Sequence, residues 1–214
     1  MACIESGIDF HTMVVYGLDP AAFKTIDTGV QRSASDATIL HHPEMPRAVA
    51  RDCAAAAKWT NRIRCGMTTK AAYAKLSNTE VLEMLAKHPE ILQCVTNIRG
   101  FGVPANQRPV NLGAAAAFYF VVSKAGWEKA TTFMRDLFVG DGIERDSPAY
   151  QVRAYIIEDQ AKRYRSNSAV RMMTIMKAWN LTMRGRPAKT LQSITLKGDE
   201  SCPVLLLSAS GSRM

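Results

Sequence analysis

The sequence predicts a mainly α-helical bundle that follows a small α/β segment at the N-terminus. From residue 44 onward, the chain consists of alanine-rich or apolar stretches that begin with capping residues and end at glycine or proline. Nearer the N-terminus, a short run rich in β-branched residues is bounded by glycine, which is typical of a strand. With 47% hydrophobic and 21% charged residues over 214 positions, the chain has the composition of a globular protein with a core of its own.

Residues 1–43 contain the predicted α/β segment. The run HTMVVYG forms its strand. Asp19 and Pro20 begin a helix after this strand, because a capping residue followed by proline is a common start signal. Ser33 or Ser35 is predicted to cap a further helix, which ends before residue 44.

Residues 44–198 contain the predicted helical domain. Ser77 and Glu80 have the spacing of a capping box, in which each side chain bonds to the other residue's backbone. The run GFGVPANQRPVN has two glycines and two prolines and is predicted to be a loop. The helices are predicted over MPRAVARDCAAAAKWTNRI, TTKAAYAKL, SNTEVLEMLAKHPEI, LGAAAAFYFVVSKAG, WEKATTFMRDLFVG, SPAYQVRAYIIEDQAKRYR and SNSAVRMMTIMKAWNLTMRG.

The last predicted helix begins with Ser166 or Asn167 as its cap and ends at Gly185. Its apolar residues recur at three- and four-residue steps and predict a face toward the core, made by Ala169, Met172, Met173, Met176, Trp179 and Met183. A mostly basic face is predicted for Arg171, Thr174, Lys177, Leu181 and Arg184. Residues 199–214 form a tail, in which Leu205–Leu207 either pack as an extended segment or fray.

The basic residues are concentrated in one block near the C-terminus. Residues 160–198 contain nine Lys or Arg and no Asp or Glu, whereas the rest of the chain has 18 basic and 19 acidic residues. A solvated helical face normally mixes both signs, because opposite charges at i,i+4 stabilise it. A block of one sign repels itself unless a polyanion neutralises it. The block favours nucleic acid as the partner, while a solvated face and an acidic protein partner are the alternatives.

The residues predicted to contact phosphates lie on the last two helices and just beyond them. Backbone contacts carry little sequence information, so weakly specific binding, to DNA in particular, is expected. Tyr164 lies among these residues and either stacks on an unpaired base or belongs to the core. The predicted contacts are Lys162, Arg163, Arg165, Arg171, Lys177, Arg184, Arg186 and Lys189.

A second candidate phosphate site lies near the N-terminus. Thr28, Gly29 and Arg32 have the composition of an anion site at a helix N-terminus. The competing interpretation is a turn glycine followed by a surface arginine.

The sequence favours a protein that is not an enzyme and carries no cofactor or metal. His41 and His42 are adjacent, so on a helix they point about 100° apart and are poorly placed to bind one metal. The acidic run GDGIERD lacks calcium-loop spacing, and GFGVP lacks the lysine of a phosphate loop. No catalytic Ser/His/Asp or Cys/His arrangement can be argued from these residues.

The cellular location expected from the sequence is the cytoplasm. No apolar run reaches the roughly 18 residues that span a bilayer, and no secretory signal is present at the N-terminus. Five cysteines, an odd number without CxxC spacing, indicate free thiols in a reducing compartment.

Two stretches carry motifs in a recognisable order. The first contains Ser6-Gly7, Val14-Val15-Tyr16-Gly17-Leu18, Phe23, Thr25, Asp27, Gly29, Arg32 and Asp36. The second contains Lys177, Ala178, Trp179, Asn180, Gly185, Arg186 and Leu191. Together they resemble the ParB-like nuclease-domain proteins of phages and bacteria, which carry a V-x-V-V-x-G-L strand, an F-x-T-x-D-x-G helix and a C-terminal K-A-W-N segment.

The resemblance implies that residues 1–43 are the second half of a ParB-like domain. The Gly-Gln-His-Arg-Leu signature that precedes this half in the family is absent. In relatives with nucleotide activity the missing segment contacts the triphosphate, so CTP binding, CTP hydrolysis and nuclease activity are not expected here. The strand left behind would have an exposed edge, which predicts either a homodimer through this edge or a rearranged N-terminus.

These patterns predict a nucleic-acid-binding protein of phage or mobile-element type in the cytoplasm of a bacterial host cell. The first alternative is a phage interaction protein that inhibits a host defence or nucleic-acid-processing complex. The second is a ParB-like nuclease or nucleotide hydrolase.

Overall fold

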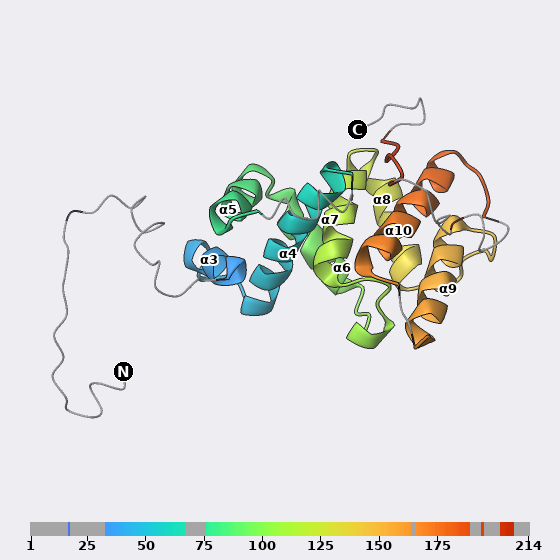
Figure 1. Ribbon diagram of the computed structural model, residues 1–214, viewed down its shortest axis with the longest axis horizontal. Helices are drawn as coiled ribbons and strands as arrows, with labels where there is room; N and C mark the ends of the chain where they lie inside the picture. The colour runs from blue at the N-terminus through green and yellow to red at the C-terminus, as the bar shows by residue number, and fades with distance from the viewer. Residues whose placement is uncertain are drawn as a thin grey trace. The chain divides into compact units, whose positions relative to one another are not determined.

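A computed structural model describes residues 33–66, 76–163, 166–188 and 202–207, together with Gly17 and Ile194. This part of the chain is mainly helical, which confirms the predicted fold class at that level (Figure 1). Apart from Gly17, the predicted strand and the helix after it fall on residues outside the described ones, and so does the predicted helix TTKAAYAKL except for its last residue. Of residues 1–43, assigned to the second half of a ParB-like domain, only Gly17 and residues 33–43 are described. The described helices are α3 (Ala34–His41), α4 (Arg47–Arg64), α5 (Asn78–Lys87), α6 (Glu90–Gly100), η3 (Ala105–Gln107), α7 (Leu112–Ser123), α8 (Trp127–Phe138), α9 (Pro148–Ala161) and α10 (Ser168–Met183).

The predicted helix starts are confirmed where the structure describes them. Ser33 caps α3 and Ser77 caps α5, each through a complete capping box. The side chain of Asn167 accepts a hydrogen bond from the Val170 N–H at the start of α10. The predicted stretch SNTEVLEMLAKHPEI is divided into α5 and α6, because Pro89 has no N–H to continue the helix.

The core is built around α7, which packs against α4, α6 and α8 (Figure 1). Eleven of its twelve residues are buried. Helix α7 buries Gly113 and four alanines, and four of the eight buried residues of α4 are alanines, so the two helices approach closely where small residues meet. At one such point, a Cβ on Gly113 would collide with the Cβ of Ala55 and lie 3.1 Å from the Asp52 carbonyl oxygen.

An aromatic cluster extends the core from α7 to α8 and α10. Trp179 of α10 is fully buried, and its ring meets Phe133 edge-on at 5.4 Å between centroids and Phe118 at 6.4 Å. This cluster ties the helix that carries the basic block to the central helix of the bundle. The predicted burial of Met172, Met176 and Trp179 is confirmed.

The compact unit of helices begins at Ser33, whereas the sequence placed a boundary between residues 43 and 44. Helix α3 packs against α4 and α5 and so belongs to the same unit as the helices that follow. At the other end, Leu205 and Leu206 are buried, and Leu205 joins the main core. Of the two outcomes predicted for this tail, packing as an extended segment is therefore the one observed.

Replacing Gly113 by alanine is expected to destabilise the protein. The added methyl meets the Ala55 methyl and backbone, which cannot rotate away, so the expected loss in free energy of unfolding is about 1–3 kcal/mol. The measurement is urea denaturation followed by circular dichroism. Gly100→Ala in α6 is the matched control, since nothing lies within 4 Å of its added Cβ. Equal stability of the two variants would contradict the close α4–α7 contact.

Candidate nucleic-acid interface

The predicted basic block is spread over both ends of α10. Lys162 and Arg163 lie just after α9 and are exposed. At the other end, Arg184 and Arg186 follow α10 and are also exposed, whereas Lys177, on the helix itself, is half-buried. The remaining predicted contacts, Arg165 and Lys189, lie outside the described residues, as do Tyr164 and the candidate phosphate site Thr28, Gly29 and Arg32.

Arg171 differs from the other basic residues because it is ion-paired in the interior. Its side chain is 14% exposed, and its Nη2 lies 2.9 Å from Oδ2 of Asp159, whose side chain is 5% exposed. Its Nε donates a second hydrogen bond to the same oxygen at 3.0 Å. Asp159 also accepts hydrogen bonds from the backbone N–H and the hydroxyl of Ser166. The Asp159 carboxylate on α9 therefore binds both the α9–α10 turn, through Ser166, and α10, through Arg171.

The prediction that Arg171 and Thr174 share an exposed basic face is wrong. Thr174 is fully buried, and its hydroxyl donates to the Val170 carbonyl within the helix. At about 100° per residue, Arg171 and Arg184 point roughly 140° apart, so they cannot belong to one narrow stripe. The buried positions occupy more than half of the circumference of α10, and Arg171 falls within that arc.

Two exposed basic residues precede α10 and two follow it, so the length of this helix separates Lys162 and Arg163 from Arg184 and Arg186. The helix has 16 residues, which at about 1.5 Å per residue is roughly 24 Å. Lys162 forms an exposed ion pair with Glu158 at 3.2 Å, one turn earlier on α9. Exposed pairs of this kind contribute little to stability, so the ammonium group can exchange its partner for a phosphate.

Two residues of α10 have a role that the sequence did not reveal. The Asn180 side chain donates to the Val204 carbonyl at 2.8 Å and accepts from the Leu206 N–H at 2.9 Å. The Trp179 indole donates to the Leu206 carbonyl at 2.9 Å. These three bonds fasten the extended segment 202–207 to α10. The apolar run PVLLL signalled that the segment packs, but no local pattern indicated where.

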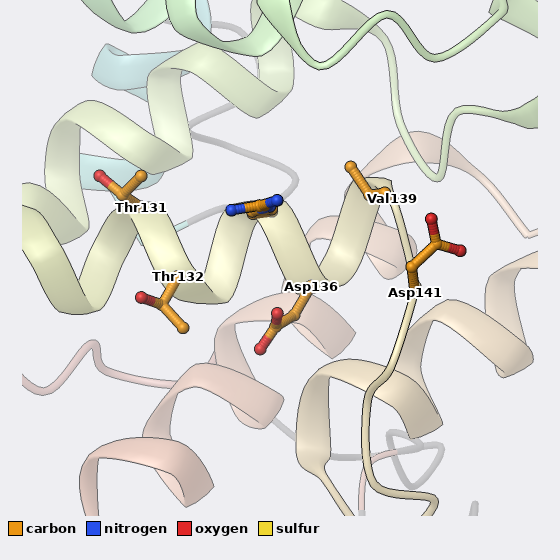
Figure 2. A pocket seen from close by; sticks show the side chains of 6 residues that line it. Thr131, Thr132, Asp136, Val139 and Asp141 are labelled. Carbon is orange, nitrogen blue, oxygen red and sulfur yellow. The ribbon is translucent and has the colours of Figure 1, made fainter.

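A pocket of about 320 Å³ lies along α8 and is distant in sequence from the basic block. It is lined by Thr131, Thr132, Arg135, Asp136, Val139 and Asp141. Figure 2 shows the side chains of Thr132 and Asp136 on the same side of the helix. Burial raises the pKa of Asp136, and the charge of Arg135 opposes this effect. The pocket offers the half-buried carboxyl group of Asp136 and the exposed hydroxyl of Thr132 to a small polar molecule, whereas the Thr131 hydroxyl already donates to the Trp127 carbonyl.

The described residues contain no group of three or more His, Cys, Asp or Glu side chains placed to hold a metal ion. Cys53, Cys65, Cys94 and Cys202, the cysteines that the structure describes, are free thiols. Burial raises the pKa of Cys53 to about 11 and that of Cys94 to about 12, so both stay protonated near neutral pH. Within the same described ranges, no helix has the length and apolar character needed to cross a bilayer.

Comparison with known proteins gives no relative for this chain. No family model matches it, and neither a curated protein nor a solved structure is significantly similar to it.

Proposed function

We propose that this chain binds nucleic acid, with duplex DNA as the favoured ligand, through exposed basic residues at the two ends of α10. The supporting observation is that Lys162, Arg163, Arg184 and Arg186 are all exposed in a stretch of sequence without a single acidic residue. Lys177 lies between the two ends and adds a half-buried charge. The relation to ParB-like proteins of phages or mobile elements, implied by the resemblance, is part of the same proposal.

The spacing of the two basic ends sets the length of duplex that can be bound. About 24 Å of helix corresponds to roughly seven base pairs, at about 3.4 Å per base pair. A duplex shorter than this reaches one end only. Affinity should therefore rise with duplex length up to roughly seven base pairs and then change little.

Replacing Lys162, Arg163, Arg184 and Arg186 together by alanine is expected to weaken DNA binding and flatten its salt dependence. Each phosphate contact contributes a slope of about −0.9 to log K against log salt on duplex DNA, so losing four contacts removes roughly 3.6 from the slope. The measurement is fluorescence anisotropy of a labelled duplex over a series of salt concentrations. The same salt series with a labelled single strand shows whether the protein binds duplex or single-stranded DNA more tightly.

A matched control removes four other exposed basic residues, Arg51, Lys58, Lys129 and Arg145. This control variant has the same net charge as the test variant, so the difference between the two reports the position of the charges. Equal slopes for the two variants would contradict the proposed surface. If the unmodified protein does not bind at low salt, nucleic-acid binding is excluded and an acidic protein partner becomes the better explanation of the block. Cleavage of the DNA in the presence of a divalent metal would instead support the nuclease alternative.

A further inference from the structure

A second group of basic residues surrounds Phe120, near the C-terminal ends of three helices. Arg64 is the last residue of α4, Lys124 caps the end of α7, and His88 caps the end of α5. The Lys124 Nζ lies 5.5 Å from the centre of the Phe120 ring, the Arg64 Cζ lies 6.0 Å from it, and the His88 ring lies 5.2 Å from it. Three segments that are far apart in sequence thus bring their basic groups to one ring.

The positive charges of this group are not paired directly with carboxylates in the described ranges. Arg64, Lys87 and Lys124 are exposed, and none of them forms an ion pair with an acidic residue of the described ranges. The pKa of His88 lies below its ordinary value, first because of burial and then because of the charges of Arg64 and Lys124, with a smaller effect of Lys87. Glu90 opposes this shift. The imidazole therefore lies in a net positive field.

Helix ends explain only part of this arrangement. The C-terminus of a helix carries about half a negative charge, which favours one nearby cation, and the ring face of Phe120 adds a weak cation–π attraction. The full positive charges of Arg64, Lys87 and Lys124 together exceed the partial negative charges at the C-terminal ends of α4, α5 and α7. A bound anion would remove the remaining repulsion.

We propose that Arg64, His88 and Lys124 form a phosphate-binding site, with Lys87 adding positive charge next to His88, and that this site is distinct from the residues that flank α10. A phosphate group presents several acceptor oxygens, which suit the guanidinium fork, the ammonium group of Lys124 and one imidazole N–H. The phosphate belongs either to a nucleic-acid backbone or to a free phosphate compound. The site does not depend on the proposed function, because its residues are different ones.

The test uses His88 as a reporter inside the site. A bound phosphate favours the protonated imidazole, so its pKa should rise by about 0.5 or more when inorganic phosphate is added. The pKa is followed by NMR titration of the imidazole signals in the full chain, with His88→Gln to assign the resonance. Sodium chloride at matched ionic strength is the control, because screening alone weakens the repulsion from the neighbouring cations.

Two variants distinguish phosphate binding at this site from a general effect of the positive charge of the protein. Arg64→Ala combined with Lys124→Ala should abolish the phosphate-induced shift, whereas Lys129→Ala, on the exposed surface of α8, should leave it unchanged. A duplex that shifts His88 when inorganic phosphate does not would identify a nucleic-acid backbone as the ligand, and the reverse would identify a free phosphate compound. If neither the duplex nor inorganic phosphate raises the pKa of His88 more than sodium chloride does, the proposed site is refuted. The α10 variant that lacks Lys162, Arg163, Arg184 and Arg186 keeps this site, so the two proposals fail independently.

Discussion

Asp159→Asn is expected to lower the free energy of unfolding by about 3 kcal/mol. The substitution leaves the Arg171 guanidinium in the interior without its counter-charge, and breaking one partner of a buried pair typically costs about 3–5 kcal/mol. We expect a value at the lower end of this energy range because the Arg171 side chain remains partly exposed to solvent. The measurement is urea denaturation at neutral pH. The double variant Asp159→Asn with Arg171→Met should recover much of the loss, since it removes both charges.

The same pair predicts a dependence on pH. Burial raises the pKa of Asp159, but the hydrogen bonds from Ser166 and the Arg171 guanidinium outweigh it, and the pKa lies below its ordinary value. A lowered pKa contributes stability above the unfolded value of about 3.9, and this contribution is lost as pH falls through the folded value. The stability difference between the native protein and Asp159→Asn should therefore shrink in acid. A difference that stays constant down to acid pH would show that the carboxylate is not the source of the effect.

Trp179→Ala is expected to destabilise the protein by about 3–5 kcal/mol. The indole is fully buried between Phe118 and Phe133, so its removal leaves a large cavity among rings that cannot collapse freely. It also removes the hydrogen bond that fastens segment 202–207. Urea denaturation measures the loss, and limited proteolysis shows whether the C-terminal segment is released.

The variant Trp179→Phe helps to distinguish the ring packing of Trp179 from its indole hydrogen bond to the Leu206 carbonyl. Phenylalanine keeps most of the ring contacts but leaves the Leu206 carbonyl without its indole donor, which costs about 1–2 kcal/mol. The Asn180 bonds to Val204 and Leu206 remain in this variant, so the segment should stay attached. If Trp179→Phe is as unstable as Trp179→Ala, the single ring that phenylalanine keeps contributes little, and the loss comes from the indole hydrogen bond together with the packing of the missing second ring.

The helices could be predicted from sequence because their signals are local. The capping boxes at Ser33 and Ser77 and the stop at Gly185, where φ is +61°, involve residues only a few positions apart. The core face of α10 was predicted for the same reason. Local patterns also showed that the basic residues form one block, and four of them are exposed as expected.

What the sequence could not supply are the contacts between distant segments. The pairing of Arg171 with Asp159 turns a predicted binding residue into a structural one, and it depends on how α9 packs on α10. The group around Phe120 was missed for the same reason. Its members come from the ends of three helices, and no single window of sequence contains them.

The contact between α4 and α7 has a consequence for folding entropy. Alanine and glycine have no side-chain rotamers to lose, so the points where Gly113 and the alanines of these helices meet form with little loss of side-chain freedom. Larger residues at those points would bury more apolar area but would have to freeze several torsions and hold the backbones apart. We therefore expect Gly113 and the position of Ala55 opposite it to tolerate very few substitutions.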